Sequence, residues 1–264
     1  RFGSTELRAM LTMKNLAGAG WLQALKTPTL EAVFDRLLSR LHKKMARDSG
    51  FFPINYSSLE DFTAFSIEAA EQIDLLGTWL KEEHRFVNED LHVRRVALED
   101  LEPFFSGNPW TSALENKRVL VVHPFVNSIR SQYQKREEIF PSNSRMLPRF
   151  SLLNLAPPQT LGGKSSSLED WFDGLIRTFS AARSLEFDVA IVGAGSYGLP
   201  LSGLLKKEGR TVIHLGGVTQ ILFGIKGRRW DNSSRHRALY NASWRFPAPS
   251  EKPEGRNLGT SSYW

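Results

Sequence analysis

The chain of 264 residues contains no cysteine. This absence excludes a disulfide framework, a thiolate metal site and a cysteine nucleophile. Apolar runs long enough to span a bilayer are also absent, since the longest stretches, such as residues 119–122, have the length of a strand. The sequence shows no signal peptide, although it begins at Arg1 and not at a methionine. We therefore expect a cytoplasmic protein, and this expectation leaves room for peripheral association with the inner face of the membrane.

A strong excess of one charge is missing as well. The net charge is +6, from 34 basic and 28 acidic residues. This small surplus favours anionic partners such as nucleotide phosphates or anionic lipid headgroups. The basic residues are dispersed along the chain, so we do not expect a nucleic-acid partner. The hydrophobic share of 41% is ordinary for a globular protein and suffices for the core of a single α/β domain over residues 1–264.

Residues 1–100 are expected to be mainly helical. Apolar residues at helical spacing predict a helix over residues 30–47. Ser58 and Asp61 make a capping-box pattern that predicts a second helix as far as Glu71. Residues 73–78 predict a short strand, and residues 93–98 are ambiguous.

From residue 117 to residue 217 the pattern alternates between strands and helices. The expected strands are residues 119–122, 150–155, 189–192 and 211–215, and the expected helices are residues 128–140, 167–184 and 199–207. Such alternation is typical of parallel βαβ units. We therefore predict an α/β fold with a Rossmann-like, mostly parallel sheet and flanking helices. Residues 218–264 are expected to form an irregular C-terminal arm, which is rich in basic and aromatic side chains.

A glycine-rich turn lies between the third expected strand and its helix. Gly193, Gly195 and Gly198 form the pattern G-x-G-x-x-G. Glycines permit a tight turn, and the start of the helix offers N–H groups to a phosphate; the alternative is a tight turn without a ligand. A dinucleotide enzyme would also carry an acid at the end of the next strand, which instead ends in Gly216 and Gly217. NAD and FAD are therefore disfavoured.

The same turn suggests a serine hydrolase as an alternative. Ser196 lies one residue away from the position of a G-x-S-x-G nucleophile, and Asp231 and His236 would have to complete a triad. We rank this hypothesis below phosphate binding. The segment L-G-G-K-S at residues 161–165 is similar to the end of a P-loop, but Pro158 stands where the first glycine is required. The six histidines show no metal-binding spacing.

The first six residues, R-F-G-S-T-E, resemble the R-x-G-D-G-E segment of GT-D-fold glycosyltransferases. Four further segments are similar to a bacterial subgroup of GT-D-like proteins, and together these similarities extend over most of residues 1–230: N-P-W at residues 108–110, V-L-V-V-H-P-F at 119–125, Q-Y at 132–133 and the segment from 216 to 230. The resemblance implies a glycosyltransferase that moves a sugar from a nucleotide-sugar donor, such as a UDP-sugar, to a glycan, lipid-linked or glycoprotein acceptor. The expected role is cell-surface polysaccharide assembly.

The resemblance also implies roles for two N-terminal residues. Glu6 matches the glutamate of the family's D-x-E element, so we expect it to be the catalytic base or a ligand of Mn²⁺ or Mg²⁺. Ser4 stands where the family has aspartate, and a serine hydroxyl is not a hard anionic ligand. A non-catalytic nucleotide- or nucleotide-sugar-binding protein is therefore the alternative function.

The predicted nucleotide-sugar-binding residues are Arg1, Gly3, Ser4, His123, Gly193, Gly195, Ser196, Tyr197, Gly198, Gly216, Gly217, Gln220, Lys226, Arg228 and Arg229. His123 follows a strand at the usual ligand edge of a parallel sheet, and its alternative is a buried, hydrogen-bonded histidine. Lys226, Arg228 and Arg229 could belong to a lid that closes over the donor. Their alternative is a basic arm fixed on the surface by Trp230 and Trp244.

Overall fold

The computed structural model describes residues 45, 49–81, 83, 93–161 and 167–252. The predicted helix over residues 30–47 lies almost wholly outside the described residues. Arg1, Gly3, Ser4 and Glu6 also lie outside them, so the structure leaves their predicted roles untested.

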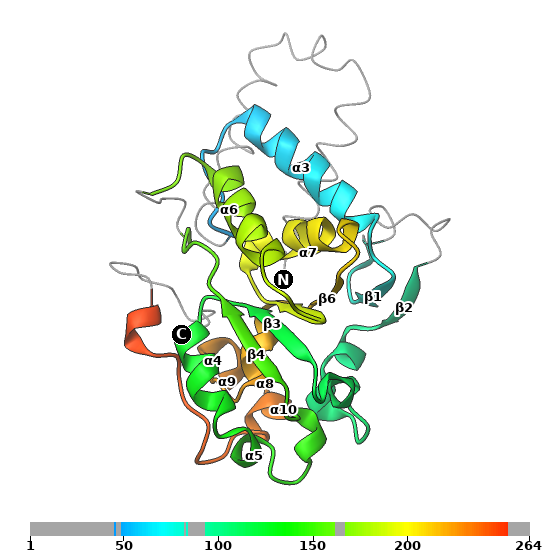
Figure 1. Ribbon diagram of the computed structural model, residues 1–264, viewed down its shortest axis with the longest axis vertical. Coiled ribbons are helices and arrows are strands. Elements are labelled where there is room, and N and C mark those ends of the chain that lie inside the picture. Colours follow the sequence, from blue (N-terminus) through cyan, green and yellow to red (C-terminus); the bar gives the residue numbers. More distant parts are fainter. Residues whose placement is uncertain (1–44, 46–48, 82, 84–92, 162–166, 253–264) are drawn as a thin grey trace.

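A four-stranded parallel sheet forms the centre of the fold (Figure 1). Its order is β4-β3-β5-β6, and the strands are β3 (Arg118–Val122), β4 (Ser151–Leu155), β5 (Val189–Val192) and β6 (Thr211–His214). Val122 is in register with Leu155 and Val192, and Val192 is in register with His214. The carboxyl ends of all four strands therefore meet at one edge. Because the strand order changes direction between β3 and β5, their ends form a topological switch point, where α/β sheets usually bind ligands.

The predicted α/β fold with a Rossmann-like parallel sheet and flanking helices is confirmed. The four core strands begin and end within one residue of their predicted bounds. The pattern was informative because β3 is buried on both faces, so it needs aliphatic residues at every position from Val119 to Val122. The ambiguous segment is β2 (Arg94–Ala97), which pairs in parallel with β1 (Leu75–Thr78) in a separate two-stranded sheet.

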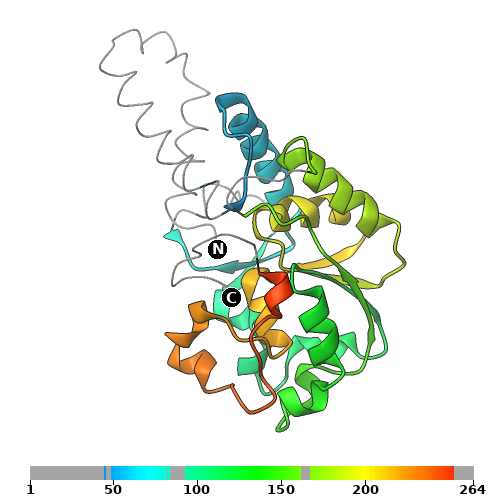
Figure 2. The ribbon, with the colours of Figure 1, turned by 90° about the vertical axis from the view of Figure 1, so that its left-hand side faces the viewer.

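Helices cover both faces of the main sheet (Figures 1 and 2). One face carries α3 (Tyr56–Ala70), α6 (Trp171–Arg183) and α7 (Gly198–Lys207). The other face carries α4 (Val126–Tyr133), α5 (Arg136–Ile139), α8 (Thr219–Leu222) and α9 (Arg228–Asp231), with α10 (Ser234–Arg237) beside α9. The short 3₁₀ helices are Leu98–Leu101, Pro103–Phe105, Trp110–Leu114, Ser144–Met146, Gly195–Tyr197, Gly216–Val218 and Pro249–Glu251.

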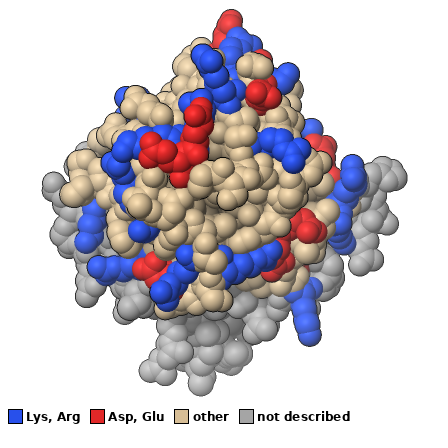
Figure 3. Space-filling view, turned by 90° about the horizontal axis from the view of Figure 1, so that it is seen from below, with Lys and Arg blue, Asp and Glu red and all other residues tan. Residues whose placement is uncertain are grey.

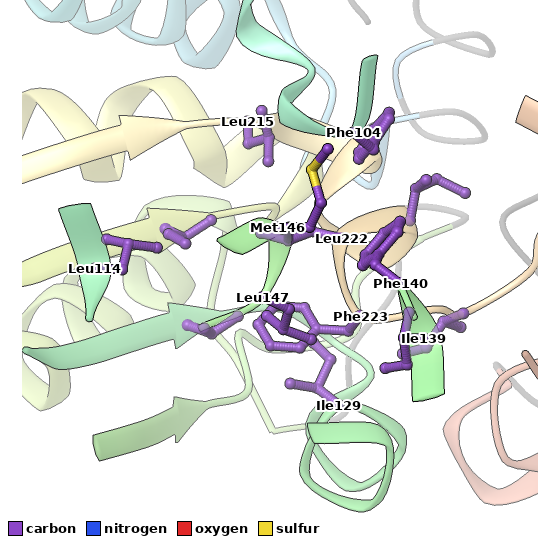
Figure 4. Close-up of a cluster of buried hydrophobic side chains, with 14 of the residues drawn as sticks. Phe104, Leu114, Ile129, Ile139, Phe140, Met146, Leu147, Leu215, Leu222 and Phe223 are labelled. Atoms are coloured by element: carbon purple, nitrogen blue, oxygen red, sulfur yellow. The ribbon is translucent and has the colours of Figure 1, made fainter. Parts of the chain in front are cut away.

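Two hydrophobic cores form because successive strand residues point to opposite faces. Leu120 and Val122 enter the core that contains Trp171, whereas Val119 and Val121 enter the core that contains Phe223. Figure 4 shows part of the second core, in which Ile129, Phe140, Leu147 and Phe223 come from different elements.

Three helix predictions needed correction. The helix predicted over residues 128–140 is divided into α4 and α5. The helix predicted to open at Ser167 begins at Trp171, where Asp170 is the N-cap and accepts from Asp173 N at 2.7 Å. Similarly, α3 begins at Tyr56 and is capped by Asn55. Several polar residues in each segment can cap a helix, and the burial of the following apolar face decides which one does.

The C-terminal arm is more regular than its sequence indicated. Residues 218–252 contain three four-residue helices, α8 to α10, and a parallel bridge joins Ile225 to Arg245. Trp230 and Trp244 are buried in the second core. This segment therefore contributes to the core in addition to lying on the surface. Within the described residues, no helix has the length and apolarity that a bilayer crossing requires.

We expect Trp244→Ala to destabilise the fold by about 3–5 kcal/mol, since it removes a buried aromatic side chain and leaves a cavity. Trp244 is 4% exposed, and its Nε1 donates to Ile139 O at 3.1 Å. Phe246, which is 50% exposed, provides the control, and Phe246→Ala should change the free energy of unfolding by less than about 0.5 kcal/mol. Urea denaturation measures both. Equal effects would show that the arm is not part of the core.

Candidate functional site

Three segments meet at the carboxyl edge of the sheet. His123 follows β3, the glycine-rich turn at residues 193–198 follows β5, and a second turn at Gly216 follows β6. The structure thus brings together residues that lie up to 96 positions apart, from His123 to Thr219 of α8. This edge is our candidate site.

Gly193 is the contact point of the three segments. Its N–H donates to Val122 O at 2.8 Å, which continues the pairing of β3 with β5 beyond the strand ends. A Cβ atom at this position would lie 2.6 Å from Gly216 O, 2.7 Å from Thr219 Oγ1 and 2.7 Å from His123 Cδ2. Any larger residue at position 193 would push these groups apart.

Two other glycines present open backbone at the same edge. Gly195 has φ +57° and Gly216 has φ +63°, and apart from their chain neighbours no atom of the described residues lies within 4 Å of the position that a Cβ would take at either one. Gly195 opens a 3₁₀ turn that leads into α7, and the first N–H groups of such a helical segment have no acceptor within the helix itself. Backbone of this kind can approach a phosphate closely. Gly198 has a different role, since it allows α7 to pack on the ring of His214.

Ser196 and Tyr197 face the first core. Ser196 Oγ accepts from Trp171 Nε1 at 2.9 Å and donates to the carbonyl of Ser49. Tyr197 stacks on Trp171 with ring centroids 4.9 Å apart, and its hydroxyl lies 3.2 Å from Thr160 Oγ1. Burial raises the pKa of Tyr197 to about 12. Both side chains therefore anchor the turn, and only their backbone is available to a ligand.

His123 combines burial with an unused hydrogen-bond donor. Its exposed fraction is 2%, and burial lowers its pKa to about 3, so the imidazole is neutral at ordinary pH. Nδ1 accepts from Phe125 N at 3.0 Å. The proton of the neutral ring must therefore be on Nε2, which has no partner among the described residues. The ring edge that bears Nε2 and Cδ2 faces Gly193.

Thr219 is a site residue that sequence inspection missed. It is fully buried, and its Oγ1 has no hydrogen-bond partner within the described part of the chain. The hydroxyl lies against Gly193, as the ring of His123 does. The sequence offered no signal beyond the position of Thr219 three residues after Gly216, because a threonine at a helix start usually indicates a cap.

Among the other predicted ligands, Gly217 stays at this edge, whereas Gln220 and Lys226 contact other parts of the protein. Gly217 lies in the 3₁₀ turn after β6, next to Gly216. Gln220 is buried and donates through Nε2 to the carbonyls of Ile225 and Lys226, at 3.3 and 3.0 Å, so it holds the loop that follows α8. The ammonium group of Lys226 lies over the ring of Tyr240, 5.4 Å from its centroid.

The described contacts favour the fixed arm over the lid. Gln132 Nε2 donates to Gly224 O at 3.1 Å and to Ser243 O at 3.0 Å, and Asn241 Nδ2 donates to Ile139 O at 3.1 Å. These bonds join both ends of the basic segment to α4 and α5. Arg228 and Arg229 are carried on α9 at the surface of this arm, where Arg228 is exposed.

A second helix N-terminus at the same edge holds a carboxylate of the chain itself. Glu251 Oε1 accepts from Asn127 N at 2.7 Å and from Ser128 N at 3.2 Å, at the start of α4. Its Oε2 accepts from Ser128 Oγ at 2.5 Å. This carboxylate satisfies the helix start after β3, whereas the turns at Gly195 and Gly216 remain open in the described part of the chain.

Charged groups do not gather into one surface in the view of Figure 3, where basic and acidic side chains are interspersed around an uncharged central area. In the described ranges, no three His, Asp or Glu side chains form a group that could hold a metal ion. The predicted metal ligand Glu6 lies outside these ranges.

No protein-family model matches this chain, and neither a curated protein nor a solved structure is detectably similar to it. Its function has to be inferred from the geometry and chemistry of the site.

The burial of His123 predicts a pH dependence of stability. The folded pKa of about 3 lies below the ordinary value of 6.5, so between these values the unfolded chain binds a proton that the folded chain does not. Stability should therefore fall as pH decreases from 6.5 toward 3, by up to about 1.4 kcal/mol per pH unit from this group. His123→Asn keeps an acceptor for Phe125 N but cannot titrate there. Urea denaturation at several pH values should give a flatter profile for the variant, and parallel profiles would contradict the prediction.

Proposed function

We propose that this chain is a glycosyltransferase that binds a nucleotide-sugar donor at the carboxyl ends of β3, β5 and β6. One observation carries the proposal. Thr219 Oγ1 is buried, has no hydrogen-bond partner among the described residues and lies against the same glycine as Cδ2 of the buried His123 ring, at a topological switch point. An unpaired buried polar group costs about 1–3 kcal/mol, and a ligand that pairs with Thr219 Oγ1 would recover this energy.

The two kinds of group at this edge suit different parts of the donor. The turn after β5 offers backbone N–H groups and the positive end of a helix dipole, which suits the diphosphate. His123 is a neutral donor, because burial lowers its pKa to about 3. A neutral donor suits an uncharged acceptor such as a carbonyl of the base or a hydroxyl of the ribose or sugar.

Glycosyl transfer requires more than donor binding. Negative charge develops on the departing diphosphate, and preorganised N–H groups at residues 193–198 would stabilise it. The acceptor hydroxyl must lose a proton, and Glu6 is the proposed base through its resemblance to the family glutamate. Glycan, lipid-linked and glycoprotein acceptors in cell-surface polysaccharide assembly remain the proposed acceptor classes, with the protein at the cytoplasmic side of the membrane.

A divalent metal fits the residues of this chain poorly. Mn²⁺ and Mg²⁺ prefer several hard oxygen ligands, whereas the matching segment provides one carboxylate, Glu6, and the hydroxyl of Ser4. We therefore derive no step through a metal ion. The same substitution favours a second candidate function, a protein that binds a nucleotide sugar without transferring the sugar.

Thr219→Val tests the binding site with little change of shape. Because Oγ1 is buried without a partner, its removal should not lower the free energy of unfolding and should raise it by up to about 1–3 kcal/mol. The affinity for UDP, measured by calorimetry, should fall about 3- to 10-fold through the loss of one hydrogen bond. His123→Asn should weaken UDP binding to a similar extent.

The matched control is Thr178→Val on α6. Thr178 is buried as well, but its Oγ1 donates to Gly174 O at 2.7 Å. This variant should lose stability and keep its affinity for UDP. Unchanged affinity in both Thr219→Val and His123→Asn would rule out the proposed site.

Glu6→Gln tests the transfer step. Loss of an acid–base group should lower the rate of sugar transfer by about 10²-fold or more while UDP affinity is kept. The measurement is product formation from a panel of nucleotide sugars, and the exposed Glu115→Gln is the control. Near-normal turnover would show that Glu6 is not the base. Binding of a donor without transfer of any sugar would identify the non-catalytic alternative.

A further inference from the structure

Three side chains outside the candidate site are joined by hydrogen bonds. They connect the start of α10 to residues 98–105, which contain two short 3₁₀ helices. Ser233 Oγ is 2.8 Å from His236 Nδ1, and His236 Nε2 is 3.2 Å from Glu102 Oε2. Glu102 lies 134 positions from His236 in the sequence. A hydroxyl, an imidazole and a carboxylate are joined in the order that activates a serine nucleophile, with the two ring nitrogens exchanged relative to the Ser-His-Asp triad, in which the hydroxyl bonds Nε2.

The hydrogen bonds define where the protons lie in the neutral ring. Glu102 can only accept when ionised, so His236 Nε2 carries the proton and donates it. Nδ1 is then the free base and accepts from the hydroxyl of Ser233. The backbone N–H of His236 approaches Ser233 Oγ at 3.5 Å, which is compatible with a hydroxyl that donates to Nδ1.

The three hydrogen-bonded residues differ in burial. A reactive site requires a buried carboxylate and imidazole and a more accessible hydroxyl. Glu102 is 8% exposed, and the side chain of His236 is 11% exposed. Phe104 and Phe105 flank the imidazole, with ring centroids at 6.0 and 5.3 Å. These contacts restrict the imidazole ring, whereas Ser233 is only partly buried.

Helix capping explains only part of the arrangement. Ser233 is the N-cap of α10, and a cap needs the serine oxygen and a backbone N–H. A helix cap requires neither the imidazole of His236 nor a buried carboxylate from a distant segment. Because burying the Glu102 carboxylate is costly unless it is paired, capping does not explain why Glu102 lies against His236.

We propose that Ser233, His236 and Glu102 form a second reactive site, in which Ser233 is a nucleophile toward activated carboxylic esters. Ser233 Oγ attacks the carbonyl carbon while its proton passes to His236 Nδ1. The C–O bond to the alcohol breaks, and the leaving alkoxide takes that proton. Water then hydrolyses the acyl-serine by the same route, which releases the acid and restores the hydroxyl. Glu102 is a positioning residue that holds the tautomer of His236.

The two serines considered as nucleophiles differ in their proton acceptors. Ser196 is buried, donates to the carbonyl of Ser49 and accepts from Trp171 Nε1, so among the described residues no side-chain base is bonded to its hydroxyl. The hydroxyl of Ser233 instead faces an imidazole nitrogen. The structure therefore moves the hydrolase hypothesis from Ser196 to Ser233, and Asp231, the acid suggested by the sequence, is replaced by Glu102.

The test combines covalent labelling with ester hydrolysis. A fluorophosphonate should label Ser233 at least about 10-fold faster than the exposed neighbour Ser234, as located by peptide mass spectrometry. Hydrolysis of p-nitrophenyl acetate should fall by about 10²-fold or more in Ser233→Asn, which keeps a helix cap and removes the nucleophile. Ser234→Ala should leave both measurements unchanged.

Further variants separate a positioning role from a structural one. His236→Gln should abolish the labelling of Ser233. Glu102→Gln should lower the hydrolysis rate about 10-fold or more, and Glu102→Asp should restore part of it, with the circular-dichroism spectrum unchanged. UDP affinity should be the same in all these variants, so failure here is distinguishable from failure of the proposed transferase site. Labelling of Ser233 no faster than Ser234, or full hydrolysis in Ser233→Asn, would overturn the proposal and leave a helix cap with an ion pair.

Discussion

The parallel pairing of β3 with β5 is the interaction on which the rest of the structure depends. β3 is central in the sheet and fully buried from Val119 to Val122, so its residues supply both cores at once. Its pairing with β5 extends past the strands through Gly193 N and Val122 O. Because β3 and β5 are separated by 66 residues in the sequence, this pairing alone brings His123 and the glycine-rich turn to one place.

The candidate site differs from the residues that hold it in place in whether its polar groups have hydrogen-bond partners. Trp171, Ser196, Tyr197 and Thr160 satisfy one another beneath the turn, and Gln220 satisfies the loop after α8. At the edge itself, His123 Nε2 and Thr219 Oγ1 remain without partners among the described residues. A well-bonded frame around unpaired donors is the organisation expected of a preorganised binding site, since the frame fixes the donors before a ligand arrives.

The C-terminal arm connects the two proposals. Trp230 and Trp244 bury this segment in the second core, and α10 then places His236 against Glu102. The basic residues that the sequence suggested as donor ligands are carried on the outside of the same arm. Burial of Trp230 and Trp244 therefore fixes the position of the arm, and its charged side chains lie on the side that faces away from the core.

The sequence by itself determined the α/β class, the four core strands and the presence of a glycine-rich βα turn, because burial on both faces and turn geometry restrict residue types locally. Only the tertiary structure decided which side chains remain free to bind. Ser196, Tyr197 and Gln220 have polar groups that suit a ligand, yet their partners are protein atoms. Thr219 had no local signal, and the sequence suggested His236 as a triad member but neither Ser233 nor Glu102 as its partner. A hydrogen-bond partner, or the lack of one, depends on segments that are distant in the sequence and meet only after folding.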